Sequence, residues 1–384
     1  MEIGKSDKLD EDKLLVEPEG APSYHVRVAP SLEDDFAEKT RALARGKVFL
    51  LTQKGLEDFA ARSVVSSLAD FFPEGLNSPN ALLLEPGEPN KHLNRLAPVY
   101  NRLIELGAER SSLILALGGG VVGDFAGFIA ATLLRGVDFV QIPTTLLAAV
   151  DSSVGGKVGV NVDRGKNMVG AFYQPRFVYF NTDFLRTLPA REWNCGLAEM
   201  VKHGFLESSG RVLEFMEENI AELRDPSSPR LARAVLDSIA VKAWVVERDE
   251  KEAGLRAVLN LGHTTAHALE SATNYERFSH GEAVSRGLAT MLILSRNLLG
   301  LPRADEERMM KAMQDLGLPL DTAGLGAGEA LAHMKYDKKN VGGRPRFVLL
   351  AGLGDPRIGL EVSEDDFTKA FSEQAERFSP ARAE

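Results

Sequence analysis

The chain has 384 residues, of which 44% are hydrophobic, enough to build two hydrophobic cores. Its net charge of −10 at pH 7 argues against nucleic acid or an anionic membrane surface as the main partner. No apolar run approaches the roughly 20 residues of a spanning helix, and one cysteine, Cys195, excludes an internal disulfide and a thiolate zinc cage. We therefore expect a soluble, cytoplasmic protein of two domains, in which histidine and carboxylate would hold any metal.

The chain begins with a tail and an α/β domain. Residues 1–22 carry seven acidic side chains and three lysines with no apolar period, so we predict a disordered acidic tail. From 23 to 186, short apolar runs alternate with segments of helical period, which predicts a parallel sheet covered by helices. The predicted strands are residues 47–52, 81–85, 112–117, 137–143 and 177–181.

From residue 187 to 384 the strand signal fades, and we predict a second domain that is mainly α-helical. The predicted helices are residues 227–249, 256–272 and 280–298. A late apolar run, RPRFVLLAGLG at 344–354, predicts a strand or a hairpin.

The first chemical signal is a strand that runs into three glycines and then an apolar helix, LILALGGGVVGDFAGF. Gly118, Gly120 and Gly123 fit the dinucleotide spacing in this context, because glycine lets a phosphate approach the backbone N–H groups of a helix N-terminus. Glycine-rich turns without a cofactor are equally common, so the motif alone leaves both interpretations open.

The second signal is the polar, glycine-rich stretch from Pro143 to Gly170. It concentrates polar and charged residues in sequence of loop character, which is unsuited to core packing. It could be an ordinary solvated loop, but loops longer than about 12 residues inside a domain are more often functional, which favours a binding segment.

The third signal is a pair of histidines, His263 and His267, four residues apart on a predicted helix, so that both can point the same way. Thr264 stands where a metalloprotease helix needs glutamate, which argues against peptide hydrolysis. Such a pair alone is more often structural than metal-bound. Glu199 and His280 on other predicted helices favour a metal, since two histidines and a carboxylate suit a catalytic divalent ion.

Seven motifs taken together resemble the 3-dehydroquinate synthase family of sugar phosphate cyclases, over about residues 45 to 355. In order they are GGGVVGDFAGF, RGVDFVQIPTTLLAAVDSSVGGK, GKNMVG, LPAREWNCGLAEMVKHG, EAGLRAVLNLGHTTAHALE, HGEAV and DKKN. The resemblance implies an N-terminal NAD-binding α/β domain and a C-terminal, mostly helical metal-binding domain. It also implies a homodimer.

The activity that the resemblance implies belongs to the shikimate pathway of aromatic amino acid biosynthesis. The family converts 3-deoxy-arabino-heptulosonate 7-phosphate to 3-dehydroquinate and phosphate. It does so by NAD-dependent oxidation, elimination of phosphate, reduction, ring opening and an intramolecular aldol closure, which makes it a carbon–oxygen lyase.

The resemblance also implies a role for individual residues, and it divides the histidine pair between metal and substrate. The metal, zinc or cobalt, would be held by Glu199, His263 and His280. NAD would contact Glu88, Lys91, Gly119, Gly120, Asp124, Thr144, Thr145, Lys166, Thr187, Leu188 and Glu192. The catalytic residues would be Asp151, Lys157, Lys202, Lys242, Glu252, Arg256, Asn260 and His267. The anionic substrate would be bound by Arg135, Lys157, Asn167, Arg256, His267 and Lys339, with Lys339 preferred to Lys338.

The chain departs from the family pattern at two places. After the first strand of the resemblance, Gln53 and Gly55 replace an aspartate and an asparagine that hold the adenine ribose, which predicts weaker NAD binding or relaxed selection against NADP. Ala266 replaces a glycine before the second histidine, and we expect its methyl group to be tolerated.

Other functions share this fold. Related cyclases act on sedoheptulose 7-phosphate, glucose 6-phosphate or an aminated substrate, but Asn260, His267 and the lysines favour the carboxylate substrate. A glycerol-dehydrogenase-like oxidoreductase would have no use for so many anion-binding residues. A non-catalytic NAD- and metal-binding protein would have lost Lys157, Lys202 or Arg256.

Overall fold

The computed structural model describes residues 2–32, 34–334 and 345–378. The chain divides into two compact units, each made of discontinuous segments. The sheet unit comprises Ser6–Leu188 and Asp225–Lys251, and the helical unit comprises Met1–Lys5, Pro189–Arg224 and Glu252–Glu384. Among the described residues, no helix is both long and apolar enough to cross a membrane.

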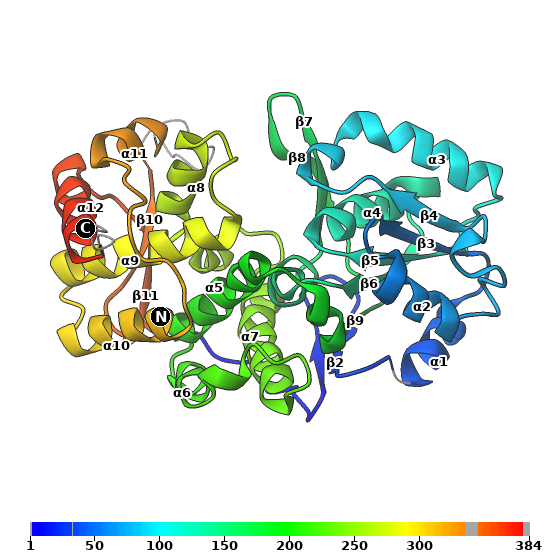
Figure 1. Cartoon of the computed structure of the whole chain (residues 1–384), viewed down its shortest axis with the longest axis horizontal. Helices are drawn as coiled ribbons and strands as arrows, with labels where there is room; N and C mark the ends of the chain where they lie inside the picture. The colour runs from blue at the N-terminus through cyan, green and yellow to red at the C-terminus, as the bar shows by residue number, and fades with distance from the viewer. Residues whose placement is uncertain (1, 33, 335–344, 379–384) are drawn as a thin grey trace. The chain divides into compact units, whose positions relative to one another are not determined.

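The sheet unit is built on a seven-stranded sheet with the strand order β1-β2-β9-β6-β5-β3-β4, of which all strands but β1 are labelled in Figure 1. Its strands are β1 (Lys13–Val16), β2 (Tyr24–Ala29), β3 (Val48–Gln53), β4 (Ala81–Leu84), β5 (Leu113–Gly118), β6 (Asp138–Pro143) and β9 (Phe177–Asn181). All neighbouring strands are parallel except β1 and β2. The predicted α/β fold with a parallel-type sheet is therefore confirmed.

Helices cover both faces of this sheet, because successive residues of a buried strand point to opposite sides. Leu50 and Leu115 pack on one face with residues of α1 (Asp34–Leu43) and α2 (Arg62–Ser67). Phe49 and Ile114 pack on the other face with residues of α3 (Leu96–Glu105) and α4 (Gly120–Thr132). The two cores hold the carboxyl ends of β5 and β6 at one edge, where Gly118 pairs with Pro143.

Residues 2–22 contain a strand of the central sheet, which corrects the prediction of a disordered tail over residues 1–22. Strand β1 pairs with β2 in antiparallel register, and Leu14 and Val16 are fully buried. The helix α7 (Pro229–Arg248) packs against both strands. The apolar residues of the tail are few, but a distant helix supplies their partner, which the local composition could not show.

The predicted binding loop at 143–170 is in part a hairpin. Strands β7 (Lys157–Val162) and β8 (Gly165–Phe172) pair in antiparallel register, and Gly159 lies opposite Gly170. A Cβ atom at Gly159 would lie 2.8 Å from the carbonyl oxygen of Val169, so the two backbones approach more closely than larger residues allow. Glycines that suggested a loop are thus the residues that let the strands pair.

The two units do not follow the predicted boundary at residue 186 throughout. The first long segment of the sheet unit ends at Leu188, and residues 225–251, which we placed in the C-terminal domain, belong to the sheet unit. The reason is α7, whose packing partners are β1, β2 and the turn at Ala148–Ser152.

The helical unit contains most of the remaining helices and one small sheet. The helices are α5 (Ala190–Leu206), α6 (Arg211–Glu218), α8 (His263–Ala272), α9 (His280–Leu299), α10 (Arg303–Asp315), α11 (Ala327–Met334) and α12 (Glu364–Arg377). Strands β10 (Phe347–Leu350) and β11 (Pro356–Leu360) form the late hairpin. The predicted helix at 256–272 is interrupted, because the 3-10 turn Leu255–Asn260 is followed by Gly262, which has a left-handed φ of 77°.

Candidate metal and nucleotide sites

Three predicted metal ligands meet in the helical unit. Glu199 lies on α5, and His263 and His280 are the first residues of α8 and α9. The Nε2 atom of each histidine is 3.5 Å from Oε1 of Glu199. Ligand atoms placed about 2.1 Å from a tetrahedral zinc ion are separated by about 3.4 Å. The spacing of the three side chains therefore suits one such ion.

Glycines allow the three helices to approach one another. A Cβ atom at Gly281 would lie 2.2 Å from the Cα atom of Cys195, so the first turn of α9 touches the backbone of α5. A Cβ atom at Gly287 would lie 2.1 Å from the carbonyl oxygen of Gly262, directly before α8. Side chains at these positions would push the ligand-bearing helix ends apart.

Hydrogen bonds orient the two imidazoles. Nδ1 of His263 is 3.1 Å from the carbonyl oxygen of Leu261, and Nδ1 of His280 is 3.3 Å from Oε1 of Glu270. With Nδ1 donating in both rings, each Nε2 is left to bind a metal. Sequence reasoning missed Glu270, although it follows His263 by seven residues, two turns along the same helix face.

The carboxylate of Glu199 is buried with one ammonium group beside it. The residue is fully buried, and neither carboxylate oxygen accepts a hydrogen bond from a described residue. Its ion pair is with the ammonium of Lys202, which is also buried. One carboxylate and two imidazoles whose ligand atoms converge are a donor set that fits a divalent metal ion.

The protonation states agree with a metal site. Burial opposes the ionisation of Glu199, but Lys202 and the two histidines hold the pKa of the carboxyl well below its usual range. Burial, with Lys202 nearby, lowers the pKa of His263, which keeps that ring neutral as a ligand must be. For His280 burial is outweighed by Glu199 and Glu270, which raise its pKa to about 10. A metal ion would take the place of that proton.

Further predicted residues of the helical unit surround or follow these ligands. The ring of His267 lies 5.8 Å from that of His263, centroid to centroid. In the turn before α8, Nδ2 of Asn260 donates to Oε1 of Glu252 over 3.3 Å, and the adjacent Arg256 is buried. A buried guanidinium and a half-buried amide suit an anionic ligand.

The glycine-rich turn of the sheet unit has the form expected of a phosphate site. Gly119 caps α4, and a Cβ atom there would lie 3.2 Å from Cγ2 of Thr145. The N–H of Thr144 donates to the carbonyl oxygen of Gly118 over 3.0 Å, which fixes the two predicted threonines beside the turn. The N-terminus of a helix of 13 residues then offers free N–H groups to an anion.

A second group of predicted cofactor residues forms one polar cluster. Nζ of Lys91 lies 2.9 Å from Oδ2 of Asp124 on α4 and 3.4 Å from Oε1 of Glu88. Burial opposes the charge of Lys91, but the two carboxylates outweigh it and raise its pKa. The cluster is therefore a charged, fixed element beside the first turns of α4.

One residue that the sequence did not single out, Asn161, connects this cluster to the hairpin. Its Nδ2 donates to Oε1 of Glu88 over 2.8 Å, and its Oδ1 accepts from the N–H of Asn167 over 2.8 Å. Its own N–H donates to the carbonyl oxygen of Lys91. Asn161 thus joins two predicted cofactor residues to a predicted substrate residue, and no spacing in the sequence signals such a link.

The remaining predicted residues are distributed as follows. Lys242 of α7 forms a 2.5 Å ion pair with Oδ1 of Asp151, and Lys242 is buried. Arg135 ends a 3-10 turn after α4, Lys157 begins β7, Lys166 and Asn167 lie in β8, Thr187 and Leu188 follow β9, and Glu192 lies in the first turn of α5. Lys338 and Lys339 lie outside the described residues.

Two family models match the chain, and together they cover residues 81–340. The N-terminal 3-dehydroquinate synthase model matches 81–195 and the C-terminal model matches 196–340. A 3-dehydroquinate synthase of Leptospira interrogans is 45% identical over 364 residues, which cover 94% of this chain and 99% of the relative. One from Acidithiobacillus ferrooxidans is 40% identical over 353 residues and covers 92% and 95%.

Solved structures agree on the fold. A 2-deoxy-scyllo-inosose synthase complexed with carbaglucose-6-phosphate, NAD+ and Co2+ has a TM-score of 0.79 at 24% identity and covers 94% of this chain and 99% of its own. A 2-epi-5-epi-valiolone synthase from Streptomyces hygroscopicus with NAD+ and Zn2+ has the same TM-score and identity and covers 93% and 98%. From the two models and the full-length relatives we conclude that the chain belongs to the 3-dehydroquinate synthase family.

Proposed function

We propose that this chain is a 3-dehydroquinate synthase that acts on 3-deoxy-arabino-heptulosonate 7-phosphate. The observation that carries the proposal is the convergence of Glu199, which is buried, with His263 and His280, in a chain that resembles full-length synthases. A metal held by these residues and an NAD held at the glycine turn would polarise a substrate hydroxyl and exchange its hydride.

The chain's own residues would bind and orient a substrate that carries both a carboxylate and a phosphate. Lys202, Arg256, Asn260 and His267 offer donors in the helical unit, of which Lys202 and Arg256 are buried. Arginine binds carboxylate and phosphate through a planar fork, and a buried cation attracts an anion more strongly than an exposed one does. The net charge of −10 makes such local donors necessary.

In the sheet unit, the proposal gives a positioning role to the pair of Lys242 and Asp151. The Lys242 ammonium is held by Asp151, which fixes its Nζ atom for contact with substrate. Lys157, Asn167 and Arg135 would add donors, as the resemblance implies. Elimination of phosphate needs a base at the substrate carbon, and the substrate's own phosphate oxygen can serve.

Several finer properties belong to the same proposal. The enzyme would be a carbon–oxygen lyase that regenerates NAD in each turnover and functions as a homodimer. Its metal would be zinc or cobalt, as supported by the cyclase structures with Co2+ and Zn2+ and by the nitrogen and oxygen donors here.

Two other activities would use the same fold. A probable glycerol dehydrogenase from Sinorhizobium meliloti has a TM-score of 0.64 at 13% identity, and the two cyclases above have the higher TM-score of 0.79. The buried Lys202 and Arg256 favour a phosphorylated acid over glycerol. A sugar phosphate without a carboxylate, or an aminated analogue, is the nearer alternative.

The test is phosphate release from 3-deoxy-arabino-heptulosonate 7-phosphate with catalytic NAD, before and after chelation and with zinc or cobalt restored. We expect metal-dependent release that matches formation of 3-dehydroquinate, with no net NADH. His263→Ala should abolish release, whereas His25→Gln, at an exposed histidine of the sheet unit, should not. Release only from sedoheptulose 7-phosphate, or NADH accumulation with glycerol, would contradict the proposal and identify the alternative.

A further inference from the structure

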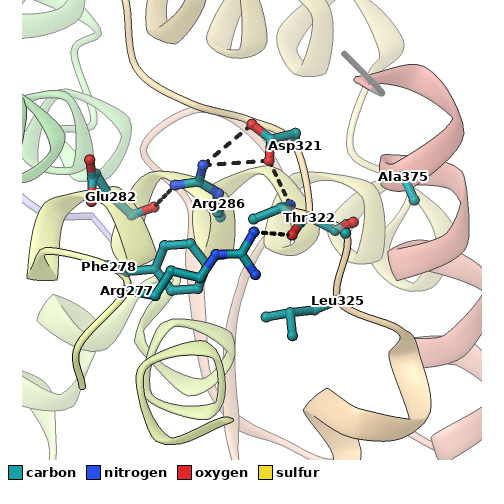
Figure 2. Close-up of a pocket in the computed structure, with 10 residues that line it drawn as sticks. Arg277, Phe278, Glu282, Arg286, Asp321, Thr322, Leu325 and Ala375 are labelled. Atoms are coloured by element: carbon teal, nitrogen blue, oxygen red, sulfur yellow. Dashed lines mark hydrogen bonds and ion pairs between the residues drawn. The ribbon is translucent and has the colours of Figure 1, made fainter. Parts of the chain in front are cut away.

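The helical unit contains a pocket whose lining includes none of the predicted site residues. It has a volume of about 740 Å³, a size typical of small-molecule sites. Its lining includes Arg277 and Phe278 before α9, Arg286 on α9, Asp321 in the segment before α11, and Leu325 and Ala375 (Figure 2). The pocket thus combines an apolar wall with two guanidinium groups.

Both arginines have N–H groups that are not fully hydrogen-bonded to described residues. Arg286 is 9% exposed, and its Nε atom has no hydrogen-bond acceptor within the described part of the chain. Its Nη1 donates to the carbonyl oxygen of Glu282 over 3.0 Å, whereas both contacts of its Nη2 with Asp321 are long, at 3.4 Å. The guanidinium of Arg286 is thus incompletely hydrogen-bonded, and a ligand carboxylate could supply Nη2 with a shorter contact than Asp321 does.

Arg277 also lies beside Phe278, and its side chain donates one hydrogen bond within the described part of the chain. Its Nη2 donates to the carbonyl oxygen of Ala323 over 2.7 Å, and no carboxylate of a described residue pairs with it. The guanidinium carbons of Arg277 and Arg286 lie 5.2 and 4.9 Å from the centroid of the Phe278 ring. Cation–π contacts with the Phe278 ring therefore stabilise both guanidinium groups in the pocket lining.

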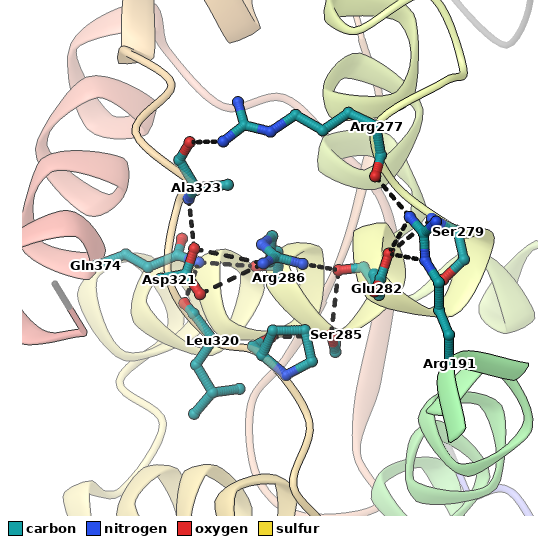
Figure 3. A network of polar contacts seen from close by, with 11 residues as sticks. Arg191, Arg277, Ser279, Glu282, Ser285, Arg286, Leu320, Asp321, Ala323 and Gln374 are labelled. Atoms are coloured by element: carbon teal, nitrogen blue, oxygen red, sulfur yellow. Dashed lines mark hydrogen bonds and ion pairs between the residues drawn. The ribbon is translucent and has the colours of Figure 1, made fainter. Parts of the chain in front are cut away.

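The polar network around the pocket leaves one positive charge unbalanced (Figure 3). Arg191 pairs with Glu282 over 2.7 Å, and Arg286 is the partner of Asp321. Arg277 has no such partner among the residues described here. A ligand with one negative charge would balance the one excess positive charge. A phosphate group, with nearly two negative charges, would be repelled by the carboxylates of Asp321 and Glu282.

We propose that this pocket binds a small organic carboxylate, with the carboxylate held by Arg277 and Arg286 and an apolar body against Phe278, Leu325 and Ala375. The guanidinium fork matches the planar carboxylate. The apolar wall selects for a compact hydrocarbon or aromatic body. The proposal is independent of the activity proposed above, because no metal, cofactor or substrate residue takes part.

The test is calorimetric titration of the full-length protein with benzoate, with its neutral isostere benzamide and with inorganic phosphate. We expect benzoate to bind and benzamide and phosphate to bind at least about tenfold more weakly, since a charged hydrogen bond accounts for about that factor. Equal binding of benzoate and benzamide, tighter binding of phosphate, or no benzoate binding would each overturn the proposal.

Two pairs of variants place the binding in this pocket. Arg277→Gln should weaken benzoate binding about tenfold or more, whereas Arg303→Gln, at an exposed arginine of the same unit, should leave it unchanged. Ala375→Glu would add a competing carboxylate and should abolish binding, whereas Ala375→Gln, of the same size, should weaken it far less. Benzoate binding that is unaffected by Arg277→Gln and Ala375→Glu would show that it binds elsewhere.

Discussion

At the scale of single residues, the metal ligands were predicted from the sequence, whereas the residues that form hydrogen bonds to site residues were missed. Glu199, His263 and His280 could be named from their chemistry and from the resemblance, and the structure brings them together. Glu270 and Asn161 are not among the predicted residues, because their roles consist of hydrogen bonds that only the fold brings within reach. The residues that bind a metal can thus be predicted from the sequence, whereas most of the residues that orient them by hydrogen bonds cannot.

Glu270 offers a direct test of such orientation. Its carboxylate accepts from Nδ1 of His280, which raises the basicity of Nε2. We expect Glu270→Gln to lower the affinity for zinc by about 10- to 100-fold, as measured by competition with a chromophoric chelator. Glu276→Gln, at an exposed glutamate of the following turn, is the matched control and should change nothing. Equal affinities for Glu270→Gln and wild type would mean that the contact does not tune the metal.

Gln53 at the end of β3 offers a second test at this scale. A carboxylate at this position would accept hydrogen bonds from the ribose hydroxyls of NAD, which glutamine does less strongly. We expect Gln53→Asp to tighten NAD binding about tenfold and to lower affinity for NADP, whose extra phosphate a carboxylate repels. Fluorescence titration with both nucleotides measures the two constants, and Gln53→Glu tests whether reach matters. Unchanged NAD affinity would show that Gln53 does not face the ribose.

At the scale of elements, apolar runs located the central strands, because buried parallel strands are apolar on both faces. The same reasoning missed β1, β2 and the hairpin of β7 and β8, in which charged residues or glycines stand beside the apolar ones. Their pairing depends on partners that are distant in sequence or on close backbone contact. The split of the predicted helix at 256–272 likewise follows from one left-handed glycine, Gly262.

Gly281 lets α9 pack closely against α5, which brings the metal ligand His280 near Glu199. Because a Cβ atom there would lie 2.2 Å from the Cα atom of Cys195, Gly281→Ala must displace α9 from α5. We expect a loss of roughly 1–3 kcal/mol in the free energy of unfolding, as overpacking usually costs, together with weaker zinc binding. Urea unfolding measures the first and chelator competition the second. Gly326→Ala, where an added Cβ atom meets nothing within 4 Å, is the control, and equal stability of the two variants would refute the packing argument.

At the scale of the whole molecule, the three metal ligands and the glycine turn belong to different units. The metal ligands all lie in the helical unit, and the glycine turn with the cluster of Lys91 and Asp124 lies in the sheet unit. The sequence suggested this division but not the return of α7 to the sheet unit. No local pattern in 229–248 distinguishes a helix that covers one unit from a helix that covers the other.

This organisation predicts that the two ligands stabilise different parts of the chain. Zinc at 100 times its dissociation constant should stabilise the helical unit by about 2.7 kcal/mol, which slows amide exchange through unit-wide opening about 100-fold. We expect hydrogen-exchange mass spectrometry to show this slowing in α5, α8 and α9 after zinc is returned to chelated protein, and little change in β5 and α4. NAD alone should protect β5 and α4 instead. His280→Ala should lose the zinc effect and keep the NAD effect, and equal protection of both units by zinc would mean that they open as one.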